Sequence, residues 1–532
     1  MNKRTIGFIA GEVDTNVFWF VSDTDRFPPR LEYLVIPNVK ERDGTEFKRV
    51  DVLAQVTRIA NYSDIISKNL SLRELETIID RYGSSPKVFG TANILGYLDE
   101  SGNVFYPRSA ALPGQEVFVA PQEMLESFFT KNIDSGVQIG ALITREEVKV
   151  SIDPNGFRRH LAIIAQTGAG KSYLVGVILE RLLPLGATII VFDPNSDYVM
   201  MRADRNGQPT KISENVVVYR PPGIRGRRYS DDEIGGAEQY TIDFSSLTSN
   251  QVSNVAGIAQ NSVVIREAVD NAKNMLTGIY GPDQLLEQLR AFSQGEMGSR
   301  RARQAAERAT TYISRLSKFH IWGNKDIPLN DLVKPKRMSI IDLAGLQRKV
   351  SEYIVDKTLS DVWSRAITGD LDHPVFMVLE EAHNLAPGKG FGSAMSSLII
   401  DRIAAEGRKF GIFLIVVTQR PNKISSNVLS QCNSQIIMRL TNPDDMNAVR
   451  NASEGLSEDL FQDLPGLNRG EAIVVGALTK VPTMVKISGR QSEEGGSDID
   501  VVKALEKGLE LFELQKHTQL SPDKDEEIVS KW

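Results

Sequence analysis

The sequence predicts an α/β fold, in which a mainly parallel β-sheet is covered by helices, with a small N-terminal β-barrel and an inserted helical bundle. The main observation is a series of strands that are apolar at nearly every position, such as ATIIVFD, MSIIDL and IFLIVVT. Strands of this kind are buried on both faces, as in parallel sheets. Most stretches between them have apolar residues at helical spacing. The core of the fold is therefore expected over residues 146–490.

Residues 1–145 are expected to form the small β-barrel. Short segments of alternating or β-branched residues, such as TIGFIAGEV, EYLVIPN and VDVLAQVTRI, are separated by turn residues. Residues 71–82 interrupt them with leucine and isoleucine at helical spacing, so a helix is expected there. This part of the chain is predicted to be a domain of its own before the core.

The strand pattern stops twice more along the chain. Between about residues 247 and 320, apolar residues recur at helical spacing, which predicts a helical bundle inserted into the core. Residues 489–499 (GRQSEEGGSDI) have the composition of a linker. Residues 491–532 are therefore expected to be a C-terminal amphipathic helix and a flexible tail, outside the core.

Composition excludes several classes of protein. The single cysteine, Cys432, excludes a disulfide framework and a cysteine-based metal cluster. No apolar run approaches the ~20 residues that span a bilayer, and the amino terminus lacks the apolar core of an export signal. We therefore expect a cytoplasmic protein without a membrane partner. The net charge of −6 argues against a broadly basic surface, but it allows positive charge confined to a channel.

The stretch LAIIAQTGAGKSYLVG, residues 161–176, predicts a phosphate-binding loop between a buried strand and a helix. Gly168 and Gly170 let the backbone curl so that N–H groups point at phosphate oxygens, and Lys171 adds a fixed positive charge. Ala165 stands where such loops usually have their first glycine, which is tolerable at the end of a strand. The predicted nucleotide-binding residues of the loop are Thr167, Gly168, Ala169, Gly170, Lys171, Ser172 and Tyr173.

Two further strands end in polar residues that suit nucleotide hydrolysis. In VFMVLEEAHNL, Glu380 is expected beside a magnesium ion that Ser172 also contacts, and Glu381 is expected to orient and deprotonate water. In IFLIVVTQRP, Gln419 is expected to sense the γ-phosphate. The alternatives are a solvated acidic turn for the two glutamates and a turn cap for Gln419, because a proline follows it. Beside the loop, catalytic roles are the better interpretation.

With these residues in place, the chain resembles the HerA family of hexameric ATPases, relatives of the FtsK DNA pumps. The resemblance covers most of the chain, in the segments IGFIAGEV, RHLAIIAQTGAGKS, VFDPNSDY, VLEEAHNL, AAEGRKFG, VVTQRP and LPGLNRGEAIV. It implies a RecA-like P-loop ATPase core, a HAS-barrel-like N-terminal domain, and ATP with Mg²⁺. In VFDPNSDY the residues 195–197 depart from the family's usual D-P-H-G-E-Y, so little is carried over to them.

The resemblance also implies a homo-hexameric ring with nucleotide at each subunit boundary. Such a boundary needs an arginine that reaches the neighbour's γ-phosphate, and Arg408 in EGRKFG matches that position, with Arg402 as the second choice. Arg159, just before the loop strand, is a further candidate for phosphate contact. The alternative for Arg408 is a solvated arginine paired with Glu406.

Two loops are candidates for contact with a nucleic-acid backbone. The loop APGKGFG, residues 386–392, follows the catalytic carboxylates and has Lys389 and an aromatic residue. The loop RPPGIRGRR offers Arg225, Arg227 and Arg228. Either loop could instead be an ordinary solvated surface.

These observations favour an ATP-driven ring translocase or helicase for double-stranded DNA. No cluster of nuclease residues stands out, so cutting is expected to belong to a partner. The resemblance implies a NurA-type nuclease in DNA end processing, or a bacterial anti-phage effector such as a nuclease or a sirtuin-type NAD hydrolase. Two alternatives stay open: a nucleotide-stabilised ring scaffold that activates an effector with little translocation, and a pump that threads protein.

Overall fold

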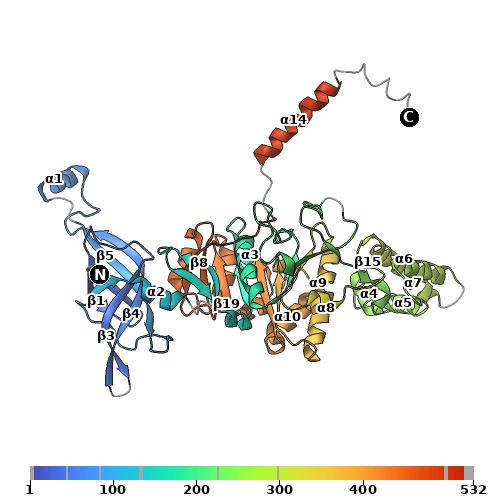
Figure 1. Ribbon diagram of the computed structural model, residues 1–532, viewed down its shortest axis with the longest axis horizontal. Coiled ribbons are helices and arrows are strands. Elements are labelled where there is room, and N and C mark those ends of the chain that lie inside the picture. The colour runs from blue at the N-terminus through green and yellow to red at the C-terminus, as the bar shows by residue number, and fades with distance from the viewer. Residues whose placement is uncertain are drawn as a thin grey trace.

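The structure is a computed structural model, and it describes residues 5–43, 46–82, 86–130, 136–224, 227–295, 299–496 and 501–519. Figure 1 shows the β-barrel at one end of the molecule, the large sheet in the middle and the helical insertion at the other end. Within the described residues, no helix combines the length and apolar character needed to cross a membrane.

The N-terminal barrel confirms the prediction for this part of the chain. Six strands close on themselves in the order β1-β7-β3-β4-β5-β2, because β2 pairs with both β1 and β5. Alternate residues such as Phe18, Phe20 and Leu34 fill the interior, as the period-two pattern requires. The elements are β1 (Thr5–Val13), β2 (Val17–Ser22), β3 (Tyr33–Asp43), β4 (Glu46–Tyr62), α1 (Leu72–Tyr82), β5 (Lys87–Leu98), β6 (Val104–Phe105), β7 (Glu116–Val119) and α2 (Gln122–Phe129).

The core is a twelve-stranded sheet in the order β13-β12-β16-β11-β17-β18-β10-β19-β20-β21-β8-β9. The strands from β13 to β19 are parallel, and those from β20 to β9 pair antiparallel. The strands are β8 (Val137–Leu142), β9 (Lys149–Ile152), β10 (Leu161–Ile164), β11 (Thr188–Asp193), β12 (Val216–Arg220), β13 (Glu238–Gln239), β16 (Met338–Asp342), β17 (Val375–Leu379), β18 (Ile412–Thr418), β19 (Ser434–Met438), β20 (Glu471–Val475) and β21 (Thr483–Ile487).

The predicted start of the core at residue 146 is wrong. Strand β8 lies before that position but pairs with β21 of the core sheet, Val485 opposite Leu142. The segment VQIGAL is almost entirely buried, and it gains its hydrogen bonds from the core rather than from the barrel. The sequence pattern shows a strand there, but it does not show which sheet the strand joins.

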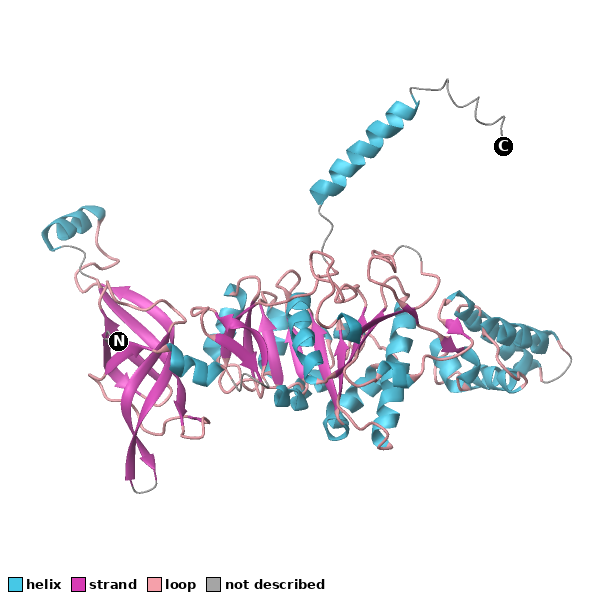
Figure 2. Cartoon of the chain, viewed as in Figure 1, coloured by secondary structure: helices cyan, strands magenta, loops and turns pink. Residues whose placement is uncertain are grey.

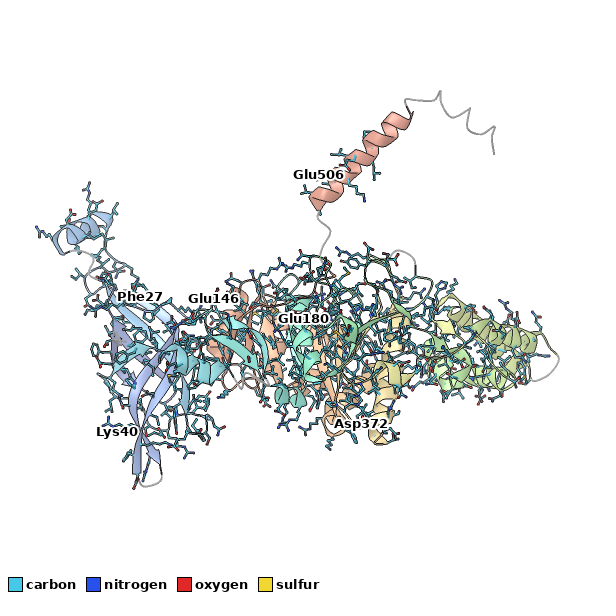
Figure 3. All side chains as sticks on the ribbon, viewed as in Figure 1. Phe27, Lys40, Glu146, Glu180, Asp372 and Glu506 are labelled. Carbon is cyan, nitrogen blue, oxygen red and sulfur yellow. The ribbon has the colours of Figure 1, made fainter. Side chains whose placement is uncertain are left out.

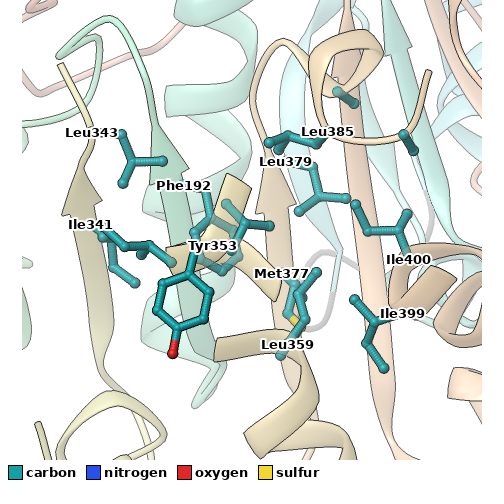
Figure 4. Close-up of a cluster of buried hydrophobic side chains, with 14 of the residues drawn as sticks. Phe192, Ile341, Leu343, Tyr353, Leu359, Met377, Leu379, Leu385, Ile399 and Ile400 are labelled. Carbon is teal, nitrogen blue, oxygen red and sulfur yellow. The ribbon is translucent and has the colours of Figure 1, made fainter. Parts of the chain in front are cut away.

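Two layers of helices and apolar side chains cover the sheet. Successive residues of β11 alternate between them: Phe192 packs with the layer of α9 and α10, and Val191 packs with the layer of α3. Figure 4 shows part of the first layer, with Leu359 of α9 next to Met377 of β17. The covering helices are α3 (Lys171–Leu182), α9 (Arg348–Ile367), α10 (Ser397–Glu406), α11 (Ser426–Gln431), α12 (Pro443–Ala452) and α13 (Glu458–Asp463).

The predicted helical insertion is present, and Figure 2 shows that it consists almost entirely of helix. Its longest helix, α7, buries Ala305, Ala309 and Ile313 on one face, as their spacing predicts. A short pair of parallel strands connects the insertion to the core. The elements are β14 (Ile242–Asp243), α4 (Ser249–Val255), α5 (Val263–Asn274), α6 (Pro282–Gln294), α7 (Arg300–Ile313), β15 (Trp322–Gly323) and α8 (Leu329–Leu332).

The C-terminal segment divides into two parts: the first differs from the predicted linker, and the second is the predicted helix. Residues 490–496 pack on the core, so treating them as a linker outside it is wrong. Their serine and glycine residues allow close contact with the core as well as the freedom that a linker needs. Helix α14 (Val501–Gln519) follows and projects away from the core (Figure 1), with exposed apolar residues such as Leu505, Leu509 and Phe512.

His160, just before β10, makes the stability of the core depend on pH. Its neutral ring bonds the Ala404 carbonyl at 3.1 Å and accepts the Leu414 N–H at 3.0 Å. Burial lowers the pKa of His160 from 6.5 to about 4, so between pH 6.5 and 4 the unfolded chain binds this proton more readily than the folded chain. We expect the free energy of unfolding to fall by about 3 kcal/mol as the pH drops from 6.5 to 4.

Urea unfolding at a series of pH values checks this prediction. His160→Gln keeps a donor and an acceptor but does not titrate, so its stability should change less over the same pH range. Parallel pH profiles for the parent and the variant would contradict the assignment.

Candidate nucleotide-hydrolysis site

The phosphate loop lies between β10 and α3, as the sequence predicts. Gly168 and Gly170 have φ values of 79° and 103°, a region that residues with a side chain rarely adopt. Ala165 has an ordinary φ, is fully buried and donates its N–H to the Thr418 carbonyl at 3.2 Å. The first glycine of the usual pattern is therefore not needed, because Ala165 directly follows β10 and continues its hydrogen bonding to β18. The Ala169 carbonyl accepts the N–H of Gly470, so a distant segment of the chain also holds the phosphate loop in place.

Lys171 contacts the carboxylates of both Glu380 and Glu381, the latter at 2.9 Å. Burial alone would lower the pKa of Lys171, but the two carboxylates outweigh it and raise the pKa. Burial raises the pKa of Glu380, which is fully buried and also accepts the hydroxyl of Tyr198 at 2.8 Å. The predicted glutamate pair thus lies directly against the loop.

Glu381 has an unusual backbone conformation that places its carboxylate at the loop. Its φ is 50°, which costs energy in a residue with a side chain and is typical of functional positions. The side chain of His383 lies 3.3 Å from the Glu381 carboxylate, and its Nδ1 is 3.2 Å from the Thr418 hydroxyl. Burial lowers the pKa of His383. The ring of His383 therefore bonds the Thr418 hydroxyl and lies against the Glu381 carboxylate.

Ser172 donates its hydroxyl to Asp197 at 2.8 Å. Asp197 is itself held by the buried carboxyl of Asp193, which accepts the Asp197 N–H at 3.0 Å. Burial, together with the charges of Asp197 and Asp342, raises the pKa of Asp193. A serine hydroxyl beside carboxylates is a hard oxygen donor set of the kind that Mg²⁺ prefers, so these residues fit that metal. Glu380 lies beneath them, with both oxygens already engaged by Lys171 and Tyr198.

Of the residues described above, Lys171, Ser172, Asp197 and Glu381 line one cavity of about 620 Å³. It brings together the phosphate loop, Glu381 and Gln419, whose amide oxygen accepts the Thr167 hydroxyl. Tyr173 does not line it; its hydroxyl accepts the N–H of Arg490 instead. The lining residues are Gln166, Thr167, Gly168, Gly170, Lys171, Ser172, Asn195, Asp197, Glu381, Gln419, Arg469, Glu494 and Gly496.

Six residues of this lining were not among the predicted site residues: Gln166, Asn195, Asp197, Arg469, Glu494 and Gly496. The sequence pattern could have indicated Asp197, because this residue follows the end of β11. The carboxyl ends of parallel strands meet at one edge of a sheet, where the phosphate loop also lies. Arg469 and Glu494 had no such signal, since they come from segments far along the chain that sequence patterns do not place. Arg469 adds a second positive charge to the cavity beside Lys171.

The predicted arginines lie at the opposite edge of the sheet. Arg159 precedes β10, whereas the phosphate loop follows it, so Arg159 lies at the other end of this strand from the loop of its own chain. Arg408 lies in the short helix η7 (Gly407–Phe410) before β18, and Gln419 follows that strand. Seven residues of strand separate these two by roughly 20 Å. Arg402 lies on α10 with its guanidinium 5.9 Å from the Trp363 ring.

The loops predicted to contact DNA differ in what they expose. Lys389 is exposed, as that role needs. Arg227 is not free for DNA contact: it donates to the Pro221 carbonyl at 2.8 Å, and only 12% of its side chain is exposed. Arg228 is exposed, with its guanidinium 5.3 Å from the Tyr229 ring. Arg225 lies outside the described residues.

Comparisons with known proteins identify the family of this chain. A family model described as the central domain of helicase HerA matches residues 137–362. A probable helicase of Methanocaldococcus jannaschii is 30% identical over 528 residues, which cover 95% of each chain. The DNA double-strand break repair helicase HerA of Pyrococcus furiosus is 28% identical, over 94% of this chain and 96% of the relative. The solved bacterial conjugative coupling protein TrwB aligns with 71% of this chain and 94% of its own, at 14% identity and a TM-score of 0.49. Because the similarity to the M. jannaschii helicase extends over nearly the whole of both chains, this chain belongs to the HerA helicase family, and it is a P-loop ATP hydrolase.

Proposed function

We propose that six copies of this chain form a ring that hydrolyses ATP between neighbouring subunits and moves double-stranded DNA through its bore. The observation that supports this best is the division of the catalytic residues between two edges of one sheet. Lys171 and Glu381 lie at one edge, and Arg408 lies at the other. A head-to-tail contact between copies joins unlike edges, and it gives a ring when the rotation from one copy to the next closes.

The residues at the phosphate loop suit hydrolysis of a nucleoside triphosphate. In the structure Glu380 and Glu381 hold Lys171, so the phosphates of ATP take their place and leave Glu381 free. Glu381 then accepts a proton from the water whose oxygen attacks the γ-phosphorus, while the bond from that phosphorus to the bridging oxygen breaks. Mg²⁺, held by Ser172 and Asp197, would neutralise charge on the phosphates.

The loop of residues 386–392 is a suitable DNA contact because its first residues are attached to two parts of the site. It begins five residues after Glu381. Its Gly388 donates its N–H to the Lys423 carbonyl at 2.8 Å, in the turn that follows Gln419. Movement of either catalytic residue is thereby passed to Lys389, whose charge attracts the phosphate backbone.

The relatives support DNA as the polymer, because several are named DNA double-strand break repair helicases. We propose that cutting is done by a separate nuclease or defence effector. ATP hydrolysis by the purified protein, measured with and without linear duplex DNA alongside the mass of the assembly, tests the proposal. A ring whose turnover ignores DNA would favour the scaffold function, and full turnover by a single subunit would refute the shared site.

Reversing the charge of Lys389 is expected to weaken the coupling to DNA. In Lys389→Glu, a negative charge faces the phosphate backbone, so the ratio of DNA-stimulated to DNA-free ATP turnover should fall, and more so at low salt. Titration of duplex DNA at two salt concentrations measures this ratio. Lys211→Glu reverses the charge of another exposed lysine outside the loop and is the matched control. An unchanged ratio in Lys389→Glu would show that this loop does not contact DNA.

A further inference from the structure

Residues 490–496, here called the C-terminal strap, are attached to the phosphate-loop helix α3 by a buried carboxylate. Glu180 of α3 is 5% exposed, and its two oxygens accept the N–H groups of Gln491 and Ser492 at 2.9 and 2.8 Å. Figure 3 shows Glu180 within the core, whereas Glu506 of α14 stands far from it. Burying a carboxylate without such donors would cost free energy of folding. The two N–H groups of the strap satisfy this carboxylate, so the strap is held against α3.

Arg490 binds the strap to the first turn of α3. Its guanidinium donates to the Ser172 carbonyl at 3.0 Å, to the Ser492 hydroxyl at 3.2 Å and to the Glu493 carbonyl at 2.9 Å. The backbone of Gly176 leaves room for this guanidinium, because a Cβ there would lie 2.7 Å from it. One side chain thus connects the strap to the residue whose hydroxyl faces the cavity.

The end of the strap lies against the turn that contains Asp197. Gly495 donates its N–H to the Asp197 carbonyl at 3.1 Å. A Cβ on Gly495 would lie 2.2 Å from the Ser196 carbonyl oxygen, and one on Gly496 would lie 1.6 Å from the Asp197 carboxylate. Only glycine fits at either position while the strap stays in place. Glu494 and Gly496 also line the cavity.

From these contacts we propose that the strap is part of the nucleotide site. It holds Asp197, and through Asp197 the hydroxyl of Ser172, where the magnesium ion of the nucleotide is bound. Gly495 and Arg490 are therefore positioning residues for the metal, 323 and 318 residues along the chain from Ser172. This inference rests on the proposed function, because it takes the cavity to bind ADP or ATP with Mg²⁺.

The test measures binding by the full-length protein, using a fluorescent ADP with Mg²⁺ and with EDTA. In Gly495→Ala the new methyl group pushes the strap away from residue 196. The gain in ADP affinity that Mg²⁺ produces should then fall by about tenfold, as when residues behind metal ligands are changed. Affinity in EDTA should stay near that of the parent. Arg490→Ala, which removes three hydrogen bonds without adding bulk, should give the same pattern.

Gly508→Ala is the matched control, because nothing lies within 4 Å of a Cβ at that position of α14. An unchanged magnesium effect in both strap variants would overturn the inference and leave the proposed function intact. Equal loss of affinity with and without Mg²⁺ would also overturn it, since the strap would then only support the fold of the pocket. A parent protein that fails to bind the nucleotide would overturn the proposed function and this inference together.

Discussion

Replacing Arg408 by alanine is expected to lower ATP turnover by a factor of about 10³ or more while ATP binding is retained, as for arginines that act on a neighbour's γ-phosphate. Arg408 is exposed at the sheet edge opposite its own phosphate loop, so its loss leaves that loop intact. Steady-state turnover and the affinity for a fluorescent ATP analogue, measured on the assembled ring, check the two halves of this prediction.

Co-assembly of two inactive variants tests whether Arg408 acts on its neighbour. Rings that mix Arg408→Ala with Lys171→Ala contain boundaries where an intact loop meets an intact arginine. Roughly a quarter of the boundaries in an evenly mixed head-to-tail ring are of this kind, so turnover should partly return. Arg402→Ala, at the second-choice arginine, is the comparison, because the Arg402 guanidinium on α10 lies over the Trp363 ring of α9. Co-assembled rings that stay inactive would contradict a role for Arg408 across the boundary.

Replacing Glu381 by glutamine is expected to lower turnover by about 10² to 10⁴, because the amide cannot accept the proton of the attacking water. The substitution keeps the shape of the side chain, and the loss of negative charge does not weaken binding of an anion. ATP affinity should therefore be retained, in contrast to Lys171→Ala, which removes the positive charge that faces the phosphates. Single-turnover hydrolysis with bound ATP separates the chemical step from binding.

Glu307→Gln makes the same chemical change at an exposed position of the helical insertion and should hydrolyse ATP at the parent rate. If Glu381→Gln also keeps the parent rate, Glu381 is not the base. The buried Glu380 would then be the next carboxylate to test, since it contacts the same lysine.

The sequence by itself determined the features that depend on neighbouring residues. The phosphate loop of residues 165–172 could be predicted because strand, glycine turn and helix follow one another along the chain. Glu381 and Gln419 could be predicted because each follows an apolar strand, and parallel strands present their carboxyl ends at one edge. The barrel and the helical insertion followed from periods of two and 3.6 residues.

Only the tertiary structure decided the features that depend on residues distant in the chain. It assigned β8 to the core, it placed Arg227 against Pro221 rather than toward DNA, and it brought Arg469 to the cavity. It also placed the C-terminal strap on α3. A free linker and a close-packed segment can both be rich in glycine and serine, so composition does not distinguish them. A close-packed segment differs from a linker in having contact partners, which for the strap are Glu180 and the turn at Asp197. Local sequence does not specify a partner that lies about 300 residues away in the chain.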